Sequence, residues 1–264
     1  MARVIAVTNQ KGGVGKTTTC VNLAASLAAT KRRVLLVDMD PQGNATMGSG
    51  VDKNAMELSG FDVLTKRAQP AEAVVTVSEA DFDLLPANGD LTAAEVELMN
   101  EIGREHRLRL ALNTLRDNYD YILIDCPPSL NLLTVNALSA ADSILIPMQC
   151  EYYALEGLAA LMSTVEQIRE TVNPDLQIEG ILRTMYDPRN SLTLDVSGQL
   201  SEYFGDKVYR AVIPRNVRLA EAPSYGLPAL KYDRASKGAI AYLALAGEMV
   251  RRHGSKKTAT AVAV

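Results

Sequence analysis

Residues 10–18 read Gln-Lys-Gly-Gly-Val-Gly-Lys-Thr-Thr, and they stand between a short apolar run, Val4 to Val7, and a stretch of helical periodicity. Glycines let successive backbone N–H groups converge on phosphate oxygens, the helix start adds positive potential, and a lysine reaches the terminal phosphates. Because all these parts occur in this order, a tight turn without a ligand is the weaker interpretation. The stretch therefore predicts an α/β fold with a loop that binds a nucleoside triphosphate.

Two lysines distinguish this loop. Lys16 is predicted to bind the terminal phosphates, and Thr17 to offer its hydroxyl to Mg²⁺. The usual pattern has a glycine where this sequence has Gln10, and Lys11 follows it. Since Lys16 already serves the phosphates, Lys11 is either a solvated charge or a group directed at the phosphates of another chain. The loop residues expected to contact the nucleoside triphosphate are Lys11, Gly12, Gly13, Val14, Gly15, Lys16, Thr17 and Thr18.

The composition is that of one large globular domain. The chain has 264 residues, of which 47% are hydrophobic and 22% charged, as in ordinary folded proteins. A net charge of −4 means that any nucleic-acid binding must rest on a local patch. The three cysteines are too far apart for a zinc or disulfide pattern. No apolar stretch approaches the ~20 residues of a membrane span, so we expect a cytoplasmic protein without a membrane anchor.

Apolar runs of strand length alternate with helical patterns along the chain. The runs are mostly continuous, as in a parallel sheet buried on both faces, and lie at 4–7, 34–37, 121–124, 144–146, 178–182 and 208–213. The alternation predicts a single-domain, doubly wound, mostly parallel sheet of the P-loop NTPase type with helices on both faces. We expect the ATPase domain to span 1–253, with a last helix at 235–252 and a mobile tail at 254–264.

Acidic residues follow two of these runs, at the sheet edge where open α/β folds bind ligands. Asp125 has the position of an acid that holds Mg²⁺, usually through water, and Asp38 is expected beside the ion. Asp40 is predicted to orient the attacking water, because phosphoryl transfer needs mainly positioning and charge neutralisation. The alternative for Asp38 and Asp40 is turn formation or helix capping. These motifs predict Lys16 and Asp40 as catalytic residues, and Lys11 joins them only through the family resemblance that follows.

These motifs resemble the ParA/Soj family of chromosome and plasmid partition ATPases over nearly the whole chain. The most discriminating phrases are Gln149-Cys150-Glu151-Tyr152-Tyr153-Ala154-Leu155-Glu156-Gly157, Met185-Tyr186-Asp187 and Ile213-Pro214-Arg215-Asn216-Val217-Arg218. The resemblance implies ATP and Mg²⁺ as cofactors and weak intrinsic hydrolysis. It implies a homodimer that ATP closes face to face, with Lys11 of each chain on the phosphates bound to the other and Gly12 where the loops nearly touch.

The resemblance also places adenine against Met185, Pro214 and Arg215, although Arg183 stands where an apolar residue is expected. It implies non-specific binding of double-stranded DNA in the ATP-bound form through Arg189 and Arg218, a nucleoid-associated location, and a ParB-type centromere-binding partner that stimulates hydrolysis. Between positions 183 and 237, nine Lys or Arg face six Asp or Glu, a modest basic surplus. Each arginine has a local alternative as a solvated charge or in an ion pair.

Three other functions fit the same motifs less well. A MinD-like membrane-associated positioning ATPase needs a C-terminal amphipathic helix with basic and bulky apolar faces, whereas residues 255–264 offer two lysines and small residues. An iron–sulfur reductase on this fold would need ligands from Cys20, Cys126 and Cys150. Asp40 disfavours a nucleotide-binding scaffold without turnover.

Overall fold

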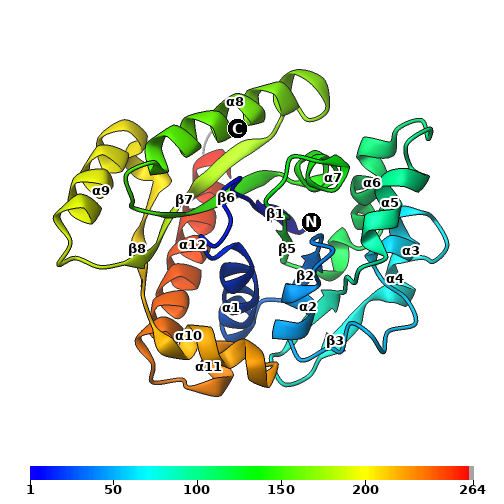
Figure 1. Cartoon of the computed structure of the whole chain (residues 1–264), viewed down its shortest axis with the longest axis horizontal. Helices are drawn as coiled ribbons and strands as arrows, with labels where there is room; N and C mark the ends of the chain where they lie inside the picture. Colours follow the sequence, from blue (N-terminus) through cyan, green and yellow to red (C-terminus); the bar gives the residue numbers. More distant parts are fainter. Residues whose placement is uncertain (262–264) are drawn as a thin grey trace.

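An eight-stranded sheet with the strand order β3-β4-β2-β5-β1-β6-β7-β8 forms the centre of the chain (Figure 1). The computed structural model describes residues 1–261, and the side chains of residues 1–254. The strands are β1 (Arg3–Val7), β2 (Val34–Asp38), β3 (Val75–Val77), β4 (Phe82–Leu85), β5 (Tyr121–Asp125), β6 (Ser143–Gln149), β7 (Gln177–Tyr186) and β8 (Val208–Pro214). Among these strands β3 and β4 pair antiparallel, and the other neighbours pair parallel.

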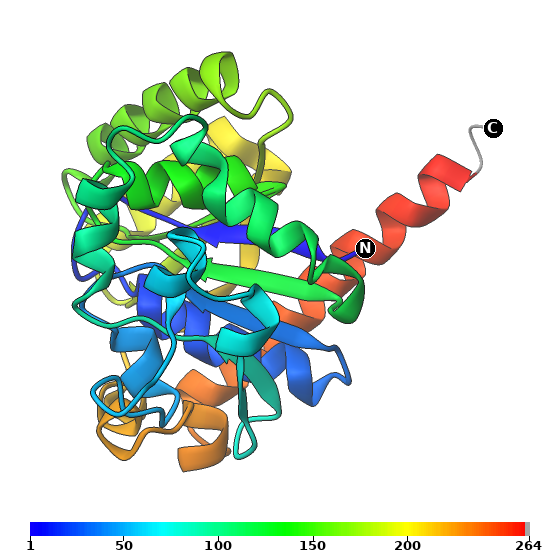
Figure 2. The same ribbon diagram turned by 90° about the vertical axis from the view of Figure 1, so that its right-hand side faces the viewer.

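Helices cover both faces of the sheet (Figures 1 and 2). They are α1 (Lys16–Ala29), α2 (Asn44–Gly48), α3 (Gly60–Leu64), α4 (Pro70–Ala73), α5 (Leu91–Glu97), α6 (Arg107–Asn113), α7 (Leu132–Ala140), α8 (Ala154–Thr171), α9 (Ser191–Phe204), α10 (Val217–Glu221), α11 (Ala229–Tyr232) and α12 (Lys237–Ala261). Short 3₁₀ helices lie at Arg104–His106, Arg116–Asn118, Gly205–Lys207 and Ala222–Tyr225. One apolar core joins the sheet to α1, α11 and α12, and the other joins it to α5–α9. The predicted fold class is confirmed.

Burial explains why the continuous apolar runs became strands. Every residue of β2 and of β5 is buried, as expected for inner parallel strands covered on both faces. The sequence did not predict β3, an antiparallel edge strand of three residues. Helix α12 ends nine residues later than the predicted helix over 235–252. The mobility of the tail stays a prediction, and its last residues, 262–264, lie outside the described part.

Close packing of β7 against β8 depends on a glycine. A Cβ built at Gly180 would lie 2.6 Å from Cε2 of the buried Tyr209 ring and 2.7 Å from the Lys207 carbonyl oxygen. We expect Gly180→Ala to lower the free energy of unfolding by about 1–3 kcal/mol, because the hydroxyl of Tyr209 is tied to Glu179 and the ring has no room to move. In α9, Gly198→Ala meets open space and should be neutral or stabilising. Thermal unfolding followed by circular dichroism compares the two; equal stability of Gly180→Ala and the wild type would contradict the expectation.

Candidate nucleotide-binding site

The loop between β1 and α1 presents backbone rather than side chains to its surroundings. Gly13 and Gly15 have φ angles of +73° and +88°, which favour glycine, and Gly15 is the residue that directly precedes α1. A Cβ added at Gly12 or Gly13 would meet nothing within 4 Å. The loop therefore leaves open space above the start of a helix, the arrangement that backbone N–H groups need to bind phosphate.

The two lysines of the loop point to different places. Lys16 is buried, and its Nζ donates to the carbonyl oxygen of Lys11 at 3.2 Å. Burial lowers the pKa of Lys16, and the nearby carboxylates, Asp125 foremost, oppose this shift. The side chain of Lys11 is 45% exposed and lies on Glu151, with 2.7 Å between Nζ and Oε2. Lys16 thus faces the interior of its own loop, whereas Lys11 faces outward.

Asp38 and Asp125 end neighbouring parallel strands and stand directly opposite each other. Both are completely buried. Oδ1 of Asp38 accepts from the backbone N–H of Asp40, and Oδ2 accepts from the N–H and the hydroxyl of Thr46 at 2.9 and 2.7 Å. Oδ1 of Asp125 accepts from the Cys20 thiol at 3.5 Å, but its buried Oδ2 has no partner among the described residues. Both carboxylate oxygens of Asp38 thus accept hydrogen bonds from the protein, whereas one oxygen of Asp125 remains available for a ligand.

The electrostatics of this pair fit a divalent cation. Burial, together with the repulsion from Asp38, raises the pKa of Asp125 to about 8, and burial raises that of Asp38 to about 6. The side chain of Thr17 beside Asp125 lowers the pKa of Asp125 in part. A cation beside the unpartnered Oδ2 would relieve both the burial penalty and the repulsion. Thr17 and Asp125 therefore have the chemistry to hold Mg²⁺, which takes few protein ligands and keeps several waters.

Asp40 is half-buried on the turn after β2. Its Oδ1 accepts from the N–H of Gln42 at 3.0 Å, and its carbonyl accepts from Gly43. The bond from Gln42 is a turn-forming contact, which was the alternative to a catalytic role for Asp40. Its Oδ2 has no hydrogen bond among the described residues, so one oxygen remains for a water.

The ends of β7 and β8 form a wall beside the loop. The hydroxyl of Thr184 donates to the Val14 carbonyl at 2.8 Å, and the next residue, Met185, has a left-handed φ of +48°. Tyr186 pairs with Pro214 across the two strands, and Arg215 is exposed. Sequence reasoning missed Thr184, which follows Arg183 beyond the apolar run at 178–182 and carries no sequence signal of its bond to the loop.

The unexpected Arg183 has a structural role at the same wall. Its guanidinium donates to Ser197 on α9 at 2.7 Å and to the Tyr209 carbonyl on β8 at 2.8 Å. The register between β7 and β8 shifts on either side of Arg183. There the arginine donates to a backbone carbonyl of β8, which an apolar residue cannot do.

Both predicted DNA-binding arginines form ion pairs with carboxylates of their own chain. Arg189, whose side chain is 88% exposed, makes two hydrogen bonds to Asp187 at 2.8 and 2.9 Å. Arg218 on α10 pairs with Glu221 at 2.8 Å and with Asp233 at 3.2 Å. The structure therefore shows the local ion pairs considered above, of a kind that contributes little to stability when exposed.

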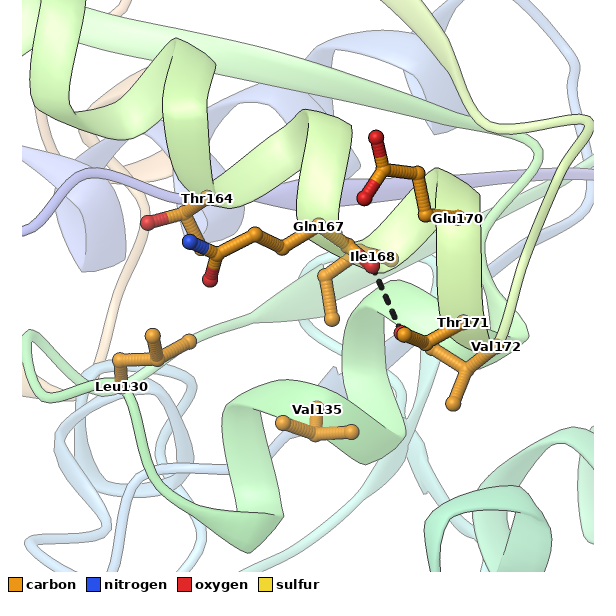
Figure 3. Close-up of a pocket in the computed structure, with 8 residues that line it drawn as sticks. All are labelled: Leu130, Val135, Thr164, Gln167, Ile168, Glu170, Thr171 and Val172. Carbon is orange, nitrogen blue, oxygen red and sulfur yellow. Dashed lines mark hydrogen bonds between the residues drawn. The ribbon is translucent and has the colours of Figure 1, made fainter.

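Three consecutive residues tie the loop to the β6–α8 part of the chain. The side-chain amide of Asn9 donates to the Pro147 carbonyl at 2.8 Å, that of Gln10 donates to the Thr164 hydroxyl at 2.9 Å, and Lys11 reaches Glu151. Figure 3 shows Thr164 at one end of a groove of about 390 Å³ between α7 and α8. None of the predicted site residues lines this groove. Glu151 stands within the phrase at 149–157, but its place in the sequence indicated no role for it.

The three cysteines are buried, and burial raises the pKa of each thiol. Such thiols stay protonated at neutral pH, whereas an iron–sulfur cluster needs thiolate ligands at an accessible surface. In the described part, no group of three or more His, Cys, Asp or Glu is placed to hold a metal ion. No helix in that part is long and apolar enough to cross a membrane.

Comparisons with known proteins identify the family of this chain. A family model described as an AAA domain matches residues 2–178. The chain is 54% identical to the sporulation initiation inhibitor protein Soj of Bacillus subtilis, over 94% of this chain and 98% of that protein. It is 51% identical to the chromosome partitioning protein ParA of Caulobacter vibrioides, over 98% of both chains.

A solved structure similar to this one bears a different name. It is the cobyrinic acid a,c-diamide synthase of Mycobacterium smegmatis with bound ADP and magnesium, at a TM-score of 0.85 and 39% identity over 97% of each chain. The Soj and ParA proteins have the higher sequence identity to this chain. The fold, the two-lysine loop and these relatives together show that the chain belongs to the ParA/Soj family of partition ATPases.

Proposed function

We propose that this chain is an ATP-driven switch for DNA partition, in which ATP closes two copies into a dimer and hydrolysis reopens it. The observation that carries the proposal is the division between the two lysines: Lys16 is buried under its own loop, and Lys11 points away from it. A partly exposed lysine directed away from its own phosphate-binding loop can turn to the phosphates of a second chain. The output of such an enzyme is a change of assembly rather than a metabolite.

Within one chain, the residues divide the work on Mg²⁺-ATP. Backbone N–H groups of residues 12–18 and the Lys16 ammonium bind the phosphates, and Thr17 and Asp125 hold the metal, with Asp38 supporting the edge of the sheet through Thr46. Bound Mg²⁺ would neutralise charge on the phosphate oxygens. Asp40 orients the attacking water through its free oxygen. The space for adenine lies beside the loop and is lined by Met185, Pro214 and Arg215.

In the dimer, Lys11 adds a positive charge to the neighbouring active site, and Gly12 lets the loops approach. Dimerisation also doubles any basic surface, which strengthens binding to phosphodiester backbones steeply. This supports ATP-dependent, sequence-independent binding of double-stranded DNA, and through it association with the nucleoid. The relatives named for chromosome partitioning support a ParB-type centromere-binding protein as the partner that stimulates hydrolysis.

The switch is tested by DNA binding measured with ATP, with ADP and without nucleotide at two salt concentrations. We expect tight, salt-sensitive binding to unrelated duplexes with ATP alone, because only the dimer neutralises enough phosphates. Equal binding in all three conditions would contradict the switch.

Arg218→Ala is expected to weaken ATP-dependent DNA binding and to reduce the slope of log K against log salt by about two per dimer, one phosphate contact in each protomer. Fluorescence anisotropy titrations measure both quantities. Arg109→Ala, which removes an exposed arginine of α6, is the matched control for the loss of charge. Unchanged affinity and slope for Arg218→Ala would remove this residue from the DNA surface.

A further inference from the structure

Lys11 has a carboxylate partner within its own chain. Its Nζ lies 2.7 Å from Oε2 of Glu151, and the two side chains are 45% and 47% exposed. In the proposed dimer this ammonium binds a phosphate held by a second chain, so the carboxylate and that phosphate attract the same group. The intrachain pair therefore competes directly with the contact that the proposed dimer requires.

Glu151 has no other side-chain partner in the described part of the chain. It lies on the turn between β6 and α8, which its own backbone holds: the N–H of Glu151 donates to the Gln149 carbonyl, and the N–H of Ala154 donates to the Glu151 carbonyl. The turn therefore keeps its shape without the carboxylate. Because Lys11 is the only hydrogen-bonding or ionic partner of this side chain in the described part, the carboxylate acts on Lys11 rather than on the fold.

The second lysine restrains the same residue. Nζ of Lys16 donates to the carbonyl oxygen of Lys11 at 3.2 Å, so Lys11 is held at its side chain by Glu151 and at its backbone by Lys16. Phosphate oxygens attract an ammonium more strongly than a backbone carbonyl does. Binding of ATP to a chain's own loop therefore draws Lys16 away and removes one of the two restraints on Lys11.

We propose that Glu151 is an intrachain latch that holds Lys11 and opposes dimer closure, and that ATP binding loosens this hold. This inference rests on the proposed switch and deepens it, because it names a group that sets the threshold for dimerisation. Closure of one dimer breaks two such pairs, one in each chain. The latch weakens the dimer with ATP by a modest factor and gives ATP binding a direct connection to Lys11.

The test is the dimer dissociation constant with Mg²⁺ and a non-hydrolysable ATP analogue, measured by analytical ultracentrifugation for the wild type, Glu151→Gln and Glu156→Gln. Glu156 is an exposed acid on α8 without a side-chain contact in the described part, so its variant carries the same charge change. We expect Glu151→Gln to dimerise about fivefold more tightly than the wild type, the worth of two exposed ion pairs. At about 1 M salt the difference should shrink below about twofold, because such pairs are screened.

The outcomes separate the latch from the switch. Equal or weaker dimerisation of Glu151→Gln, beside a wild type that dimerises, would overturn the latch and leave the switch standing. The same tightening in Glu156→Gln would assign the effect to net charge and would also overturn the latch. A wild type that stays monomeric with the analogue would overturn the proposed function itself.

Discussion

Gly12→Val is expected to abolish the ATP-dependent dimer while leaving the folded monomer and its ATP binding intact. In the single chain, a Cβ at position 12 meets nothing within 4 Å, and Gly12 is not among the glycines with positive φ. Valine therefore fits the monomer without strain. Any penalty must come from a second loop packed against it, and two such clashes per dimer weaken association at least about 100-fold.

Multi-angle light scattering with and without ATP measures the assembly, and a fluorescent ATP analogue measures binding to the monomer. Gly89→Val is the control, because a Cβ at Gly89 also meets open space and this residue lies outside the loop. A Gly12→Val protein that still forms the ATP dimer would show that the two loops do not meet at this residue. Loss of ATP binding in the monomer would instead mean that position 12 blocks its own phosphates.

Asp40→Ala is expected to lower the rate of ATP hydrolysis by about 100-fold or more while the dimer with ATP persists. Its Oδ2 is free in the described structure, and the loss of a group that positions or activates the attacking water typically costs ~10²–10⁴ in rate. The turn after β2 keeps the bond from Gly43 to the carbonyl of residue 40, so the site should keep its shape.

Steady-state phosphate release and the lifetime of the ATP-bound dimer measure the two halves of this prediction. Asp52→Ala removes an exposed acid that, like Asp40, accepts from a backbone N–H two residues on, and it serves as the control. If Asp40→Ala hydrolyses ATP at the wild-type rate, Asp40 has only a structural role through its bond to Gln42. The residue that orients the attacking water would then have to be a different one.

The sequence predicted the loop and the buried strands because their signals are local. Val4 to Val7, the glycines and Lys16 lie within one short segment, and each inner strand shows its burial as a continuous apolar run. The resemblance to the ParA/Soj family is confirmed by the relatives and by the family model. The strand β3 was missed because three residues at an antiparallel edge carry too little apolar pattern.

The roles of individual side chains depended on partners far away in the sequence. Asp38 and Asp125 both follow an apolar run in the sequence. They differ because Thr46 donates two hydrogen bonds to Asp38, while the Thr46 hydroxyl also accepts from the N–H of Ala87. The carboxylate that holds Lys11 lies 140 residues away. Arg183 looked misplaced because the irregular pairing of β7 with β8 has no sequence signature.

The position of Lys11 in the closed dimer tests the account most directly. A crystal structure of Asp40→Ala with Mg²⁺-ATP is expected to show two chains face to face, with each Lys11 ammonium within hydrogen-bonding distance of a phosphate oxygen bound to the other chain and no longer on Glu151. A dimer of the trapped protein in which Lys11 remains on its own Glu151, far from any phosphate, would contradict the account.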